Sequence, residues 1–272
     1  MTSMLSDEAH ANFPLGSEFL ELQRSAFEAA AEFTDAFSKT SGEKLPASVH
    51  GYGTVLSLMY RVACCAWGCQ GGDHQLEWLV GRVVNQAYAA YHLIQCASYD
   101  EALMLTRGVG EIANLLWLFQ QDSSEQAAWA SATRRARLTD YGPMGIRKKL
   151  EKFQGMGPPI DEKRYQRLCE IGTHPVPGLA PSHYTGTGRP ILSGAVQHVA
   201  IYVCTTELAY AVAMCGVPTS AIVMMHQSAR QQLFDASMKL VRTLGSFTIL
   251  NYEELLQKIL EGKDVGSRAE DV

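Results

Sequence analysis

The sequence predicts an all-α protein, a multi-helix bundle built around a central buried helix at about residues 99–121. Three observations support this prediction. Apolar residues recur with helical spacing along most of the chain, without an alternating strand of useful length. The stretch YDEALMLTRGVGEIANLLWLFQQ (99–121) is apolar on nearly every face, which is typical of a helix surrounded by other helices. Glycine, proline and polar turn residues divide the remainder into segments of ordinary helix length.

Three helices are expected before the central one, at about residues 17–38, 54–67 and 73–98. Ser17 is the expected N-cap of the first helix, because a serine hydroxyl can accept a hydrogen bond from a free amide of the first turn. A polar loop containing Gly42 and Pro46 is expected before the second helix. The glycines of WGCQGGD end that second helix, and the third helix leads directly to Tyr99.

Six helices are expected after the central one, at about residues 129–138, 146–153, 162–173, 192–215, 218–244 and 251–262. Asp161 is the expected cap of the third of these. Pro175 ends it, because the residue before a proline avoids the helical region. Pro218 stands where a helix can begin. The loop between Pro175 and Pro190, rich in proline and glycine, is expected to be irregular.

The chain has 272 residues, and we expect a flexible leader (1–16), a single helical domain (17–262) and a flexible tail (263–272). Hydrophobic residues make up 47%, enough for a sizeable core. The net charge of −5 gives no global basic field that would favour nucleic acid, although it does not exclude a local basic site.

A cytoplasmic location without a membrane span is the expectation from the remaining composition. The start lacks a basic region followed by an apolar run. The most apolar run, 200–217, is interrupted by Thr205, Thr206 and Glu207, which suit a lipid-facing helix poorly. The seven cysteines are an odd number within apolar helical patterns, which indicates reduced, buried thiols more than a disulfide framework.

Arg107 and Glu111 are the main polar exception on the central helix. They stand four residues apart among leucines, so the sequence indicates either a buried structural ion pair or a charged cluster that opens onto a cleft. If the pair is buried, Arg107→Ala should cost about 3 kcal/mol. Gly108 and Gly110 are unfavourable inside a helix and predict that another helix passes very close.

A second polar group lies in YQRLCEIGTH, residues 165–174. Arg167, Glu170 and His174 share one helical face with this spacing. An arginine that holds a phosphate and a histidine that transfers a proton could cleave RNA without a metal ion. The alternative is a surface Arg–Glu pair with a capping histidine. We expect Tyr165 and His174 to meet Arg107 and Glu111 in one site, because buried polar groups complete each other's hydrogen bonds.

Arg167 and His174, separated by six residues, resemble the Arg-x(4–6)-His motif of the HEPN superfamily. That resemblance implies a helical bundle and a metal-independent endoribonuclease of the bacterial toxin and defence type. Many members have a polar residue after the arginine, whereas this chain has Leu168. The chain from 81 to 175 also resembles a group of bacterial helical proteins with an Arg-x3-Glu helix and a Tyr-x2-Leu…His-Pro element, which implies a fold and one shared site.

Cys64, Cys65, Cys69 and His74 are donors that zinc would accept, but their spacing lacks the usual CxxC pairs. Buried thiols are therefore the favoured interpretation, and neither a metal nor another cofactor is expected.

Two functions remain open: a HEPN-like ribonuclease, and a non-catalytic helical module that binds a ligand or a protein. RNA, a protein partner and a second copy of the chain are the partners considered. The basic runs at 134–137 and 147–149 are either solvated or contact RNA phosphates. His198, His226 and Arg230 receive no role from the sequence.

Overall fold

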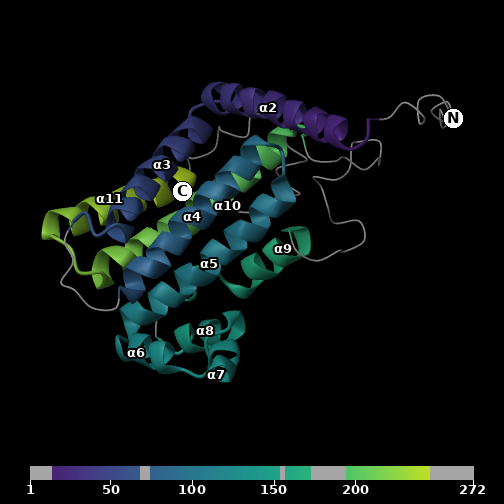
Figure 1. The fold of residues 1–272 in the computed structure, drawn as a ribbon. Coiled ribbons are helices and arrows are strands. Elements are labelled where there is room, and N and C mark those ends of the chain that lie inside the picture. The colour runs from purple at the N-terminus through teal and green to yellow at the C-terminus, as the bar shows by residue number, and fades with distance from the viewer. Residues whose placement is uncertain (1–13, 68–73, 154–156, 173–193, 246–272) are drawn as a thin grey trace.

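A computed structural model describes residues 14–67, 74–153, 157–172 and 194–245 of the chain. Of these residues, 81% are helical, and they contain ten helices and no strand. The helices pack against one another as a bundle (Figure 1). The all-α prediction is therefore confirmed for the described part of the chain.

The helices in chain order are α2 (Ser17–Thr40), α3 (Lys44–Ala63), α4 (Gln75–Gln95), α5 (Tyr99–Gln121), α6 (Ser124–Ser131), α7 (Arg134–Thr139), α8 (Pro143–Leu150), α9 (Glu162–Gly172), α10 (His198–Ile222) and α11 (Gln227–Leu244). The N-cap of α2 is Gly16, one residue before the expected Ser17. The predicted helix at 251–262 lies outside the described residues.

Helix α5 has the bounds expected for the central helix, and it packs against α10, α4, α9 and α8. Most of its side chains are buried, including Leu116 and Leu118, which have no exposed surface. One strip remains open to solvent, because Met104 is 41% exposed and Arg107 and Glu111 are half-buried. The expectation of neighbours on every side was therefore wrong along this strip, which carries the charged residues.

Two elements differ from the sequence prediction: one helix begins earlier, and one expected helix is divided in two. Helix α3 begins at Lys44, so Pro46 lies in its first turn, where a proline removes no hydrogen bond that the helix needs. The expected short helix at 129–138 is instead two helices, because the backbone of Ala132 and Thr133 is extended. Thr133 caps α7 by accepting a hydrogen bond from the Ala136 amide.

Pro218 lies inside α10, not at the start of a helix. Because proline has no amide N–H, the Met214 carbonyl four residues earlier lacks its usual helical donor. Trp117 on α5 supplies a replacement: its indole Nε1 donates a hydrogen bond of 2.7 Å to the Met214 oxygen. The helix therefore continues past Pro218, because Trp117 donates the hydrogen bond that the Met214 carbonyl would otherwise lack.

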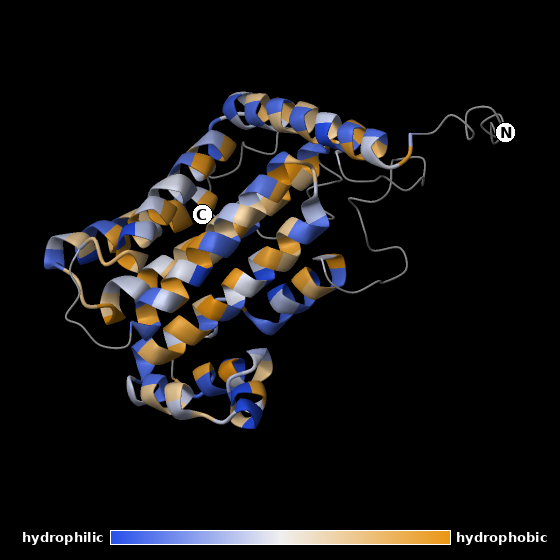
Figure 2. Ribbon diagram, viewed as in Figure 1, coloured by the Kyte–Doolittle hydropathy of each residue, from blue (hydrophilic) through white to orange (hydrophobic). Residues whose placement is uncertain are grey.

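The largest group of buried apolar side chains lies between α3, α4, α5, α10 and α11. A smaller second group joins the end of α5 to α8 through Leu115, Leu118, Phe119, Ile146 and Leu150. Figure 2 shows hydrophobic residues concentrated on the helices at the middle of the bundle, with hydrophilic residues more frequent on α2 and α9.

Among the described residues, α5 and α10 are long and apolar enough to cross a membrane. This is weak evidence for a membrane span, because buried core helices have the same length and composition. Of the apolar stretch in each helix, 61% is buried inside the protein in α5 and 78% in α10. Glu207, near the middle of α10, is almost completely buried beside an arginine of α9. Burial of this kind is what the core helices of a bundle show.

The segment before α9 is fixed to the two central helices. The Asn114 side chain on α5 donates to the Ile160 carbonyl at 2.8 Å and accepts from the Ile160 amide at 3.0 Å. The Tyr210 hydroxyl on α10 donates to the Pro159 carbonyl at 3.0 Å. Gly110 permits this approach, because a Cβ there would lie 3.0 Å from Ile160 Cγ1. The close neighbour of Gly110 is thus the segment that leads into α9 and not a helix, whereas the neighbour of Gly108 is Gln86 of helix α4, as predicted.

Candidate functional site

Four side chains from three helices form what we call the charged cluster: Arg107 and Glu111 of α5, Arg147 of α8 and Tyr165 of α9. Arg107 Nε lies 3.4 Å from a Glu111 oxygen. The Tyr165 hydroxyl donates a hydrogen bond of 3.2 Å to the same carboxylate. The guanidinium carbons of Arg147 and Arg107 lie 4.6 and 5.9 Å from the centroid of the Tyr165 ring.

Helix α9 is positioned so that Tyr165 faces α5. Asp161 caps it as predicted, because its carboxylate accepts a hydrogen bond of 2.8 Å from the Arg164 amide. The Arg164 side chain pairs with Glu207 of α10 at 3.4 Å. Cys169, one turn after Tyr165, receives a long hydrogen bond of 3.6 Å from Arg107. Polar contacts thus fix both the position and the rotation of α9.

The electrostatic environment of the cluster is positive. Two guanidinium groups lie near one phenol ring, and the Glu111 carboxylate pairs with one of them, that of Arg107. Arg147 is buried, and its Nη1 has no hydrogen-bond partner among the described residues. Burial, with the nearby Glu111 charge as the next cause, raises the pKa of Tyr165 to about 12. The phenol therefore remains a neutral hydrogen-bond donor at physiological pH.

A pocket of about 180 Å³ opens beside the cluster between α4, α5 and the corner that joins α7 to α8. Glu111 lines it, together with Arg82 and Gln86 of α4. The Gln86 Oε1 atom is buried without a hydrogen-bond partner in the described structure. Arg82 and Gln86 also line a larger groove of about 490 Å³, which extends along α4 to Trp78, a side chain that is 85% exposed.

The structure brings together three of the residues expected to share a site: Arg107, Glu111 and Tyr165. His174, the fourth, lies outside the described residues. Arg167 and Glu170 form an ion pair of their own at 3.6 Å on α9. Leu168, which follows Arg167, is a core residue with 1% of its surface exposed.

Sequence reasoning missed the contact of Arg147 with Tyr165, because the basic run at 147–149 was expected either to be solvated or to contact RNA phosphates. Ile146 and Leu150 of α8 are buried against α5. Arg147 follows Ile146 directly and is buried with them. The spacing of Ile146 and Leu150 was the available signal, since it marks the buried face of α8. The other basic run, in α7, does contain exposed arginines.

The residues left without a role have structural contacts. His198 stacks on Phe37 with ring centroids 4.4 Å apart. The His226 amide donates to the Trp67 carbonyl at 3.4 Å. Arg230 donates from Nη2 to the Val223 carbonyl at 3.3 Å. These contacts attach α10 and α11 to neighbouring segments, and none of them involves a residue of the charged cluster.

The interpretation of the cysteines as buried thiols is confirmed for Cys169, Cys204 and Cys215. Burial raises the pKa of the Cys204 and Cys215 thiols. The interpretation was wrong for Cys64, which is exposed, and for Cys65 and Cys96, which are partly exposed. Cys64 and Cys65 follow the last residue of α3, and Cys96 follows the last residue of α4. Cys69 is outside the described residues.

No protein-family model, curated protein or solved structure matches the chain.

Proposed function

We propose that this protein is a non-catalytic helical module that binds a phosphate-bearing ligand at the charged cluster and the adjoining pocket. The observation that carries the proposal is the pair of guanidinium groups around Tyr165. A buried positive charge without full compensation is costly, and a bound anion would remove that cost. Arginine is suited to this role because its planar donors match two phosphate oxygens at once.

The dimensions of the site favour a nucleotide or a single strand of RNA over a bare anion. The pocket of about 180 Å³ suits a group the size of a phosphate with part of a sugar. The groove along α4 offers further space and ends at the exposed Trp78 ring. An aromatic face combined with arginines is the combination that binds single-stranded nucleic acid by stacking and charge.

The proposal is tested by binding measurements with a fluorescent single-stranded RNA and with a mononucleotide. Arg147→Gln should weaken the affinity for RNA at least about tenfold, since a charge-assisted contact is worth 1.5–3 kcal/mol, and should flatten its dependence on salt. Arg24→Gln is the matched control, because Arg24 is exposed on α2 and pairs with Glu21 and Glu28 of its own helix. Trp78→Ala should weaken RNA binding more than mononucleotide binding.

Absence of binding by the wild-type chain would refute the proposal, as would an equal loss in Arg147→Gln and Arg24→Gln. Circular dichroism and melting of each variant separate a lost contact from a lost fold.

A second candidate is a HEPN-like, metal-independent endoribonuclease. The observation in its favour is that Arg167 lies on the helix that carries Tyr165, with 18% of its side chain exposed. RNA held at the charged cluster would then run past α9. In this proposal Arg167 stabilises the phosphate charge and His174 transfers the proton. Glu170 orients Arg167 through their ion pair.

Cleavage of labelled RNA in the presence of a chelator tests this candidate. Arg167→Ala and His174→Ala should each abolish product formation while RNA binding persists. Tight binding of RNA by the wild-type chain without any product would leave the non-catalytic module as the function.

We also propose that the protein is cytoplasmic, has no membrane role and belongs to a bacterial toxin or defence system. Its partner would be RNA, another protein or a second copy of the chain. The absence of a disulfide at the six described cysteines supports a reducing compartment.

A further inference from the structure

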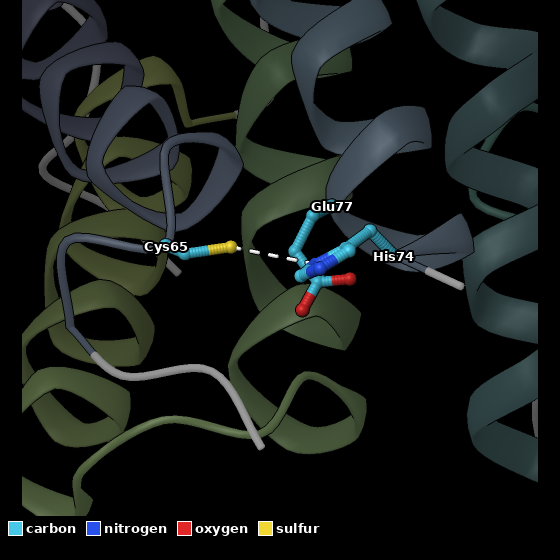
Figure 3. A group of neighbouring side chains, drawn as sticks. All are labelled: Cys65, His74 and Glu77. Atoms are coloured by element: carbon cyan, nitrogen blue, oxygen red, sulfur yellow. Dashed lines mark hydrogen bonds between the residues drawn. The ribbon is translucent and has the colours of Figure 1, made fainter. Parts of the chain in front are cut away.

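Three potential metal ligands meet where α3 ends and α4 begins, away from the charged cluster. The Cys65 sulfur, a His74 ring nitrogen and a Glu77 carboxylate oxygen all lie within 4.8 Å of one another. Figure 3 shows the Cys65 sulfur facing the His74 ring, with the Glu77 carboxylate next to that ring. Cys65 follows the last turn of α3, His74 is the N-cap residue of α4, and Glu77 lies in the first turn of α4.

The distance between the sulfur and the nitrogen fits a shared metal ion. Cys65 Sγ lies 3.6 Å from His74 Nδ1. Ligands at about 2.3 Å (thiolate) and about 2.0 Å (imidazole) from a tetrahedral zinc ion are separated by about 3.5 Å. A weak hydrogen bond between a thiol and an imidazole gives a similar separation, so the third ligand matters. Glu77 adds a carboxylate oxygen, which a thiol–imidazole pair does not require.

The backbone holds the two facing ligands in place. Cys65 and His74 both have positive φ angles, 53° and 51°, in the left-handed region that non-glycine residues seldom adopt. The Cys65 amide donates to the Val62 carbonyl at 3.0 Å, and the His74 carbonyl accepts from the Trp78 amide at 2.8 Å. Both ligands are therefore anchored to helix ends, and strain of this kind persists only where the surroundings enforce it.

We infer that Cys65, His74 and Glu77 bind a transition-metal ion of the zinc class. Thiolate, imidazole and carboxylate together suit zinc and its spectroscopic substitute cobalt, whereas magnesium and calcium prefer oxygen ligands alone. Three ligands leave one tetrahedral position for water or another donor. The ion connects the end of α3 to the start of α4, and Glu77 also lines the groove along α4. Binding should therefore stabilise the junction of these two helices.

Titration of the untagged, reduced chain with Co²⁺ tests the inference, because cobalt bound by a thiolate gives charge-transfer absorption. We expect one equivalent to bind with that absorption and Zn²⁺ to displace it. Cys65→Ser should abolish the thiolate band, and His74→Ala or Glu77→Gln should weaken binding at least about tenfold, the typical loss when a metal site is disturbed. Zinc in excess should raise the melting temperature of the wild-type chain more than that of Cys65→Ser.

Two control variants keep the result specific. Cys64→Ser removes the adjacent, exposed thiol and should leave the titration unchanged. Cys96→Ser removes the thiol of another thiol–imidazole pair, in which Cys96 Sγ lies 3.8 Å from His92 Nε2. The inference is overturned if the reduced wild-type chain binds no Co²⁺, if the band survives in Cys65→Ser, or if either control loses it equally. Circular dichroism of Cys65→Ser shows whether the fold persists.

Discussion

Arg164 of α9 and Glu207 of α10 form an ion pair of 3.4 Å with only 6% and 1% of their side chains exposed. The Arg164 guanidinium carbon also lies 3.8 Å from the centroid of the Tyr210 ring. The pair joins the helix that carries Tyr165 to the core of the bundle. A buried pair of this kind contributes little net stability when intact, but removal of one partner leaves an uncompensated charge.

Arg164→Ala should therefore lower the free energy of unfolding by about 3–5 kcal/mol. Urea denaturation followed by circular dichroism measures the change. Arg24→Ala is the control, because its side chain is 60% exposed and an exposed ion pair is worth about 1 kcal/mol or less. The combined change Arg164→Met with Glu207→Leu should recover most of the loss. If the combined variant lost as much free energy of unfolding as Arg164→Ala, packing and not the unpaired charge would be the main cause.

The hydrogen bond from Trp117 to the Met214 carbonyl makes a prediction that depends on Pro218. Trp117→Phe should cost roughly 1–3 kcal/mol beyond the lost packing, because the carbonyl is left without a donor. In a Pro218→Ala background the alanine amide supplies the helical donor, so the same change should cost less. A double-mutant cycle measures this difference. Equal costs of Trp117→Phe in both backgrounds would contradict the assignment.

The half-exposed position of Arg107 and Glu111 changes the expected effect of Arg107→Ala. The side chains are 24% and 33% exposed, so solvent stabilises the remaining carboxylate. The loss should be about 1 kcal/mol, not the roughly 3 kcal/mol of a fully buried pair. Thermal and urea unfolding measure it. Lys39→Ala, at a more exposed pair on α2, should have a smaller effect. A loss above that of Arg164→Ala would mean that the pair is closed from solvent.

Tyr165 makes a prediction about alkaline stability. Its pKa is raised from 10.0 to about 12 in the folded chain, by burial and then by Glu111. Below pH 10 the phenol is protonated in both states, and its contribution to stability is complete. Between pH 10 and pH 12 the unfolded chain releases this proton first, so the contribution is lost as pH rises. Tyr165→Phe should therefore reduce the alkaline fall in the free energy of unfolding, measured by urea denaturation across that range. The exposed Tyr88 gives the matched control, Tyr88→Phe, which should retain the wild-type slope.

The bounds of α5 could be predicted because its signals agree. Apolar side chains extend through the segment, Asp100 and Glu101 occupy the first turn, and Asp122 follows the last residue. Elsewhere, local signals were overruled by packing. Pro46 indicated a loop, but burial of Leu45 and Tyr52 extends α3 through it. Pro218 indicated a helix start, and only a hydrogen bond from a distant tryptophan explains its place inside α10.

Part of the charged cluster was also predictable. Two charges on an apolar helix required polar partners, and Tyr165 is one of them. Arg147 was not predictable from its basic run, because the rotation of α8 against α5 decides which of three consecutive cations is buried. The Cys65 and His74 pair depends on two left-handed backbone positions, which residue spacing does not reveal.

The polar attachment of α9 has a consequence for the binding function proposed above. Tyr165 contacts Glu111 from the same helix on which Arg164 pairs with Glu207, so both contacts require α9 to be docked on the bundle. By thermodynamic linkage, a ligand that binds the assembled cluster tightens the attachment of α9, and any change that loosens α9 lowers the apparent affinity by the fraction of molecules left undocked. For the ligand proposed above, the stability of α9 on the bundle would therefore set how much of the intrinsic affinity is available.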